Sequence, residues 1–121
     1  MIQITFDCLP PSELYPNKLR KIHWTKRAEV EAVSRKLGFY TAKQFQGQWQ
    51  APEMAKISYL FTVTDKRIRD VEALLIAMKP IIDGIVDAGI LKSDDCWHLS
   101  IGGASVELGK SPQTILTIEG I

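Results

Sequence analysis

An alternating segment followed by a long apolar helical segment sets what this chain can fold into. Between residues 55 and 64, the large apolar residues Ile57, Tyr59, Phe61 and Val63 recur at every second position, and the opposite face includes Ser58, Thr62 and Thr64. This period of two predicts a strand with one buried face. Between residues 73 and 88, apolar side chains recur at the spacing of a helix instead. Each apolar face must pack against another element, so the pair predicts a layered fold.

The part of the chain before residue 55 has weaker patterns of apolar residues. Residues 2–6 alternate and predict a first strand, which Pro10 and Pro11 bring to an end. Residues 12–24 have no apolar period and are expected to form an ordered loop. A helix is expected from an N-cap at Thr25 to about residue 45. Its predicted apolar stripe consists of Val30, Val33, Leu37 and Tyr40.

The C-terminal part of the chain predicts further strands. Residues 97–101, 105–108 and 113–119 have strand-like patterns, with a bend or bulge at Gly102 and Gly103. Together with the earlier elements they predict an α+β fold, in which two main helices pack on one face of a mixed β-sheet.

In and just after the segment between residues 73 and 88, single residues predict where the helix bends and where it ends. Pro80 removes a backbone donor and predicts a kink near Ile76. Gly89 suits the left-handed position that ends many helices. A polar stripe along this helix would comprise Glu72, Lys79, Asp83 and Asp87, with solvent exposure as the simplest role for Asp87.

Composition narrows the class of protein. With 121 residues the chain is expected to be one domain over residues 1–121. It has no apolar run of membrane-spanning length and no signal-peptide pattern at its start, so we expect no membrane association and a cytoplasmic location. Cys8 and Cys96 are too few for a disulfide framework, and His23 and His98 are isolated, so a zinc site is not expected.

The charge is unevenly distributed although the net charge is only +1. Between residues 17 and 45, eight basic residues stand against two acidic ones, which leaves an excess of +6. Such a segment is a candidate surface for phosphate contacts, although a basic helix face is often simply solvated. The basic residues are Lys18, Arg20, Lys21, Lys26, Arg27, Arg35, Lys36 and Lys43.

Carboxylates stand at both ends of the apolar helical segment. Asp70 and Glu72 are two residues apart, so in an extended segment their side chains point the same way. Asp94 and Asp95 follow the helix and would approach the same place if the chain turned back. Such an oxygen-rich pocket suits Mg²⁺ or Mn²⁺. The alternative is that the acidic residues only complement the helix dipole.

The order of these motifs resembles the RusA family of Holliday-junction resolvases. The resemblance rests on Arg69-Asp70-Val71-Glu72, on Lys79 and Asp83-Gly84, on Asp87-Ala88-Gly89 and on Asp94-Asp95. It implies an endodeoxyribonuclease that requires Mg²⁺ or Mn²⁺ and resolves four-way DNA junctions by paired nicks. It also implies that Asp70, Glu72 and either Asp95 or Asp94 are metal ligands, with Lys79 as the supporting catalytic cation. Paired nicks call for a homodimer with twofold symmetry.

The sequence departs from the family motif at two positions. Glu72 stands where the family has an aspartate, and Ala73 where it has an asparagine. Two other functions therefore stay open, a DNA-binding protein with weak or lost cleavage and a Mg²⁺-dependent ribonuclease. In each case the expected nucleic-acid-binding residues are Asn17, Lys18, Arg20, Lys21, His23, Lys26, Arg27, Lys66, Arg67 and Arg69.

Overall fold

Four strands form one sheet in the order β1-β4-β2-β3, and the computed structural model describes every residue from 1 to 121. β4 is antiparallel to both of its neighbours, whereas β3 is parallel to β2. The sheet is therefore mixed, and β1 and β3 are its two edges. The strands are β1 Ile2–Phe6, β2 Ala55–Val63, β3 Leu99–Leu108 and β4 Gln113–Gly120.

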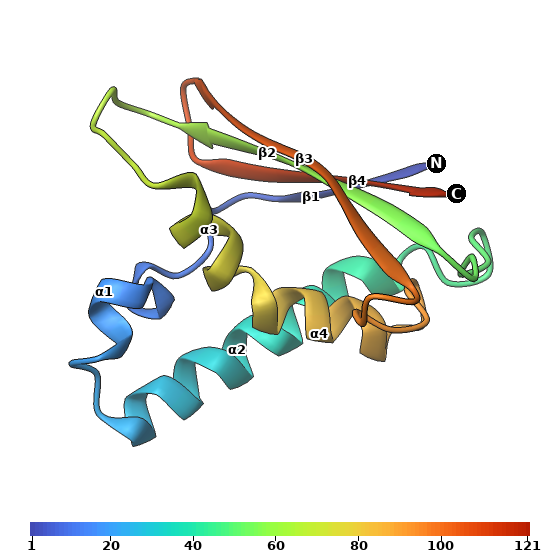
Figure 1. The fold of residues 1–121 in the computed structure, drawn as a ribbon, viewed down its shortest axis with the longest axis horizontal. Coiled ribbons are helices and arrows are strands. Elements are labelled where there is room, and N and C mark those ends of the chain that lie inside the picture. The colour runs from blue at the N-terminus through green and yellow to red at the C-terminus, as the bar shows by residue number, and fades with distance from the viewer.

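The helices gather on one face of this sheet (Figure 1). This arrangement confirms the predicted α+β class. None of the helices combines the length and apolar character needed to span a bilayer. They are the 3₁₀ helix η1 Ser12–Leu14 and the α-helices α1 Pro16–Leu19, α2 Trp24–Lys43, α3 Val71–Ala77 and α4 Lys79–Asp87.

The core lies between the sheet and the helices. Ile57 and Phe61 of β2 are fully buried, as the alternation of that segment predicts. Ile81 and Ile85 of α4 are also buried and belong to the same hydrophobic cluster. Burial of one such side chain stabilises the fold by about 1.5–3 kcal/mol, so β2 and α4 together anchor both layers.

The predicted apolar stripe of α2 is wrong. Val33 and Tyr40 are 63% and 66% exposed, whereas the buried residues of the helix are Ser34, Gly38 and Ala42. The helix buries its smallest side chains because its backbone comes very close to α4. Val33, Leu37 and Tyr40 are left exposed on the outer face.

Two glycines make this close approach of α2 and α4 possible. A methyl group added at Gly38 would lie 2.1 Å from the carbonyl oxygen of Ile81. One added at Gly84 would lie 2.0 Å from the carbonyl oxygen of Arg35. Neither neighbour is a flexible side chain, so neither clash can be relieved without moving a helix. The crossing therefore requires glycine on both helices.

Two expectations on the N-terminal side need correction. The segment expected to be a loop contains η1 and α1, which are too short to show an apolar period. α2 begins at Trp24, and its N-cap is His23 instead of Thr25. The Nδ1 atom of His23 accepts a hydrogen bond from the backbone N–H of Thr25 at 3.2 Å.

Three other local predictions, a kink, a helix end and a bulge, agree with the structure. The helical segment divides into α3 and α4 at Met78, with Pro80 in the first turn of α4, as the predicted kink requires. Gly89 has a φ of 79°, in the left-handed region. The pairing of β2 with β3 shifts register opposite Gly102, so the expected bulge is present in one continuous strand.

We predict that Gly84→Ala lowers the free energy of unfolding by about 3 kcal/mol, because overpacking against backbone outweighs alanine's better helix propensity. Gly103→Ala is the matched control, since an added methyl group there meets no atom within 4 Å. Urea denaturation of both variants measures the effect. A Gly84→Ala protein as stable as the wild type would contradict the close crossing.

Candidate functional site

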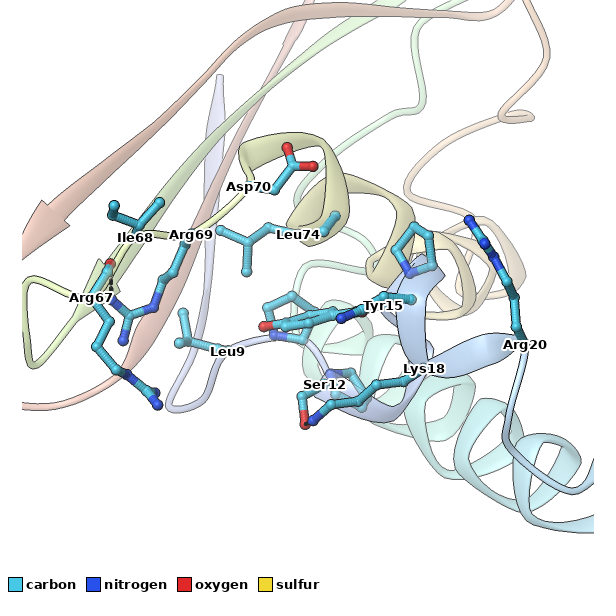
Figure 2. A pocket seen from close by; sticks show the side chains of 15 residues that line it. Leu9, Ser12, Tyr15, Lys18, Arg20, Arg67, Ile68, Arg69, Asp70 and Leu74 are labelled. Carbon is cyan, nitrogen blue, oxygen red and sulfur yellow. Dashed lines mark hydrogen bonds between the residues drawn. The ribbon is translucent and has the colours of Figure 1, made fainter.

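A cleft of about 890 Å³ opens between the segment that follows β1 and the segment that joins β2 to α3. Figure 2 shows Arg67 and Arg69 on one side of the cleft, Arg20 on the other and Tyr15 between them. Among the charged residues of the lining, the only carboxylate is that of Asp70. The cleft is therefore strongly cationic, with one acidic group at its border.

Prolines and a buried leucine shape the wall that comes from the N-terminal segment. Pro10 and Pro11 line the cleft after β1, and Pro16 begins α1. Leu14 is buried and holds η1 against the core. Burial raises the pKa of Tyr15, and the nearby positive charges of Arg69 and Arg67 act against that rise. The Tyr15 hydroxyl therefore stays neutral at physiological pH and can donate a hydrogen bond.

The opposite wall is held by hydrogen bonds around Asp65. Arg69 donates to the Asp65 carboxylate at 2.9 Å and to the carbonyl oxygens of Asp65 and Arg67 at 3.1 and 3.0 Å. The backbone N–H of Arg67 and the Arg69 side chain lower the pKa of Asp65. The side chain of Arg69 is only 18% exposed, whereas that of Arg67 is 80% exposed. Arg69 thus fixes the loop, whereas the Arg67 side chain donates only from Nε to Asp65, at 3.3 Å, and stays mostly exposed.

Asp70 is the N-cap of α3. Its Oδ1 atom accepts a hydrogen bond from the backbone N–H of Glu72 at 3.0 Å. Its Oδ2 atom takes part in no hydrogen bond within the protein. Asp70 therefore stabilises the start of α3, which is the structural alternative to metal binding. Its Oδ2 atom is still free for another partner. Glu72, in the first turn of α3, is exposed.

Lys79 joins two carboxylates at the start of α4. Its Nζ atom donates to Asp83 Oδ1 at 2.6 Å and also to Asp94 Oδ2. Partial burial lowers the pKa of Lys79, but its hydrogen bonds to Asp83 and Asp94 outweigh this effect, so the pKa is raised overall. The same contact with Lys79 lowers the pKa of Asp94. Lys79 is therefore held firmly in its cationic form.

The hydrogen-bond partners of Asp95 differ from those of Asp94. It accepts hydrogen bonds from the backbone N–H of Trp97 at 2.8 Å and from the Ser93 hydroxyl at 3.0 Å, and it lies 2.7 Å from Nδ1 of His98. The hydrogen bond with His98 is the main cause of its lowered pKa. Asp95 thus stabilises the turn before β3, and Asp94 is the residue that meets Lys79.

The four predicted metal ligands do not come together in this structure. No set of three or more His, Cys, Asp or Glu side chains is arranged to share a metal ion. Asp70 lines the cationic cleft, while Asp94 borders a separate groove with Lys79. Mg²⁺, however, is commonly held by one or two carboxylates together with waters and substrate phosphates. Asp70, which has a free oxygen at the cleft, fits that smaller donor set. Glu72 lies in the first turn of α3 instead of on an extended segment, and it is outside the cleft lining, so the predicted alignment of the two carboxylates is not present.

The predicted nucleic-acid-binding residues divide into two groups. Asn17, Lys18, Arg20, Arg67 and Arg69 all line the cleft. The remaining five are exposed outside its lining, and they are Lys21, His23, Lys26, Arg27 and Lys66.

Some of the polar side chains have partners that the sequence analysis missed. Arg27 forms an ion pair with Glu31 at 2.7 Å. Asp87, expected to be merely solvated, accepts two hydrogen bonds from Arg35 of α2, at 2.6 and 2.9 Å. The contact between Lys79 and Asp83 was also missed, although their spacing of four residues in a helix was a usable signal.

Comparison with protein-family models gave no match, and comparison with curated proteins gave none.

We predict that Lys79→Met raises the pKa of Asp94 toward its ordinary value of 3.8. Asp95 is an internal control, because His98 and not Lys79 causes its lowered pKa. An NMR titration of the side-chain carboxyl carbons measures both groups. A lowered pKa stabilises the fold above the unfolded value, so this contribution disappears as the pH falls below about 3.8. If the pKa of Asp94 does not change in Lys79→Met, the ion pair between Lys79 and Asp94 is ruled out.

Proposed function

We propose that this protein is a Mg²⁺- or Mn²⁺-dependent endodeoxyribonuclease that resolves four-way DNA junctions by paired nicks, acting as a homodimer. The observation that carries the proposal is the cationic cleft with Asp70 at its border. The resemblance of the segment around Asp70 and Glu72 to the RusA family supports the same reaction.

The charges of the cleft suit a nucleic-acid backbone. Lys18, Arg20 and Arg67 offer cationic groups to phosphates, and phosphate contacts provide most of the affinity of such proteins. Tyr15 adds an aromatic ring to the same lining, and bases or sugars stack on such rings. A DNA strand bound here would bring its phosphates to the free oxygen of Asp70.

A divalent ion held by Asp70 and Glu72 would acidify a water molecule and neutralise charge on the attacked phosphate. The protein's own residues have separate tasks. Arg67 and Lys18 would orient the strand, and Lys79, held protonated by Asp83 and Asp94, would be the supporting cation that the resemblance implies.

A second function, junction or duplex binding with weak or lost cleavage, is favoured by one observation. Asp94 is engaged by Lys79 and Asp95 by His98, so neither joins Asp70 without giving up these contacts. Such a protein would keep the cationic cleft and bind DNA without cutting it.

We predict that Asp70→Asn abolishes nicking of a synthetic four-way junction in Mg²⁺ and leaves junction binding intact. Asparagine caps a helix as well as aspartate does, so α3 should persist while the metal-binding charge is removed. Glu29→Gln removes the same charge from the exposed surface of α2 and serves as the control. Nicking is measured on denaturing gels, with and without EDTA, and binding by gel shift.

Each result of this experiment has a distinct meaning. Cutting by the wild type in EDTA, or undiminished cutting by Asp70→Asn, would contradict the metal site. A wild type that binds the junction and never nicks it would favour the second function. A preference for RNA over DNA would indicate the ribonuclease alternative.

We also predict that junction affinity depends on salt through the cleft. For Lys18→Ala combined with Arg67→Ala, the slope of log K against log salt should fall by about 0.9 for each phosphate that the variant no longer neutralises. Lys36→Ala combined with Lys43→Ala removes two cations from α2 outside the cleft lining and should change the slope little. Fluorescence anisotropy at several salt concentrations provides the slopes. Equal decreases in both variants would contradict a cleft-centred interface.

A further inference from the structure

We infer that two copies of this chain associate through the free edge of β3, so that their sheets join into one. The inference rests on the proposed function in one respect, which is the requirement for two active sites. The surface itself is assigned from the backbone and side chains of β3.

β3 is an unprotected edge strand. It runs from Leu99 to Leu108 and pairs only with β2, so the backbone groups on its other side have no strand partner. Native proteins usually protect such an edge with lysine, proline, a β-bulge or a covering loop. β3 contains neither lysine nor proline, its single charged residue is Glu107, and its bulge lies at Gly102, before the segment from Gly103 to Leu108. Its length and composition suit pairing with another strand.

The side chains of β3 add an apolar surface to this edge. Ile101, Val106 and Leu108 are 59%, 38% and 55% exposed. In the register with β2 they stand beside the buried residues Ile57, Phe61 and Val63, so they lie on the helix-covered face of the sheet. The helices nevertheless leave them uncovered. Apolar side chains next to unpaired backbone are the features that strand pairing buries.

An apolar groove continues this surface toward the helices. It encloses about 430 Å³ and is lined by Tyr59, Leu75, Ile76, Ile82, Leu99 and Ile101, with Lys79 and Asp94 at its polar end. Ile76 of α3 is itself 49% exposed. The exposed apolar area therefore runs from the edge of β3 to α3. The exposed apolar side chains are thus clustered instead of scattered singly over the surface.

A second copy of β3 is complementary to this edge. In an antiparallel pair around a twofold axis, facing residues lie on the same face of the sheet. With Val106 on the axis, Val106 meets Val106 of the partner subunit, and Leu108 meets Ala104 of the partner subunit. Glu107 then faces Ser105 of the partner subunit, so no like charges oppose each other. The same symmetry supplies the two sites that paired nicks require.

The test is the molar mass in solution, measured by light scattering without DNA or metal. We expect the wild type at micromolar concentration to have twice the monomer mass of 13.6 kDa. Val106→Lys and, separately, Leu108→Lys should shift it to the monomer. Val33→Lys is the matched control, because it places the same charge at an exposed apolar position of α2. Far-UV circular dichroism checks that each variant is folded.

A wild type that is monomeric even at concentrations far above those at which it binds DNA would overturn the inference. So would β3 variants that stay dimeric, or a Val33→Lys protein that becomes monomeric while they do not. If neither β3 variant folds, hydrogen exchange of the wild type decides. Protection of β3 amides that rises with protein concentration supports the inference, and constant protection overturns it. Because no DNA is present, failure of the proposed nuclease activity would leave these outcomes unchanged.

Discussion

The close contact between α2 and α4 is the constraint on which the helix layer depends. Gly38 and Gly84 let the two backbones approach, and the paired hydrogen bonds from Arg35 to Asp87 join the same helices at their surface. Because α4 also packs its isoleucines against the sheet, α2 is held indirectly to β2 through α4. The basic N-terminal half of α2 is thereby positioned relative to the segment that carries Asp70.

The connection from β2 to α3 is the second organising feature, since it separates two kinds of charged site. On one side, Arg69 folds the loop around Asp65 and leaves Arg67 and Asp70 at the cationic cleft. On the other side, beyond the break at Met78, Lys79 bridges Asp83 and Asp94 beside an apolar groove. The cationic cleft and the apolar groove thus lie at different places along one helical segment.

Much of the fold could be predicted because its signals are local. The alternation of β2, the division of the helical segment near Pro80 and the left-handed Gly89 each depend on a few neighbouring residues. The stripe on α2 failed for the opposite reason. Val33 and Tyr40 have helical spacing, but the helix they belong to packs through its glycine, and a hydrophobic pattern gives no sign of so close a contact.

The sequence by itself determined the α+β class, the order of the strands and the main helices, and the concentration of basic residues before Phe45. Only the tertiary structure decided which charged groups meet. It gathered Lys18, Arg20, Arg67 and Asp70 around one cleft, and it directed Asp94 to Lys79 but Asp95 to His98. Adjacent residues can point to different partners, and residues far apart in the chain can share a cleft. Such contacts depend on how whole elements pack, which no local pattern records.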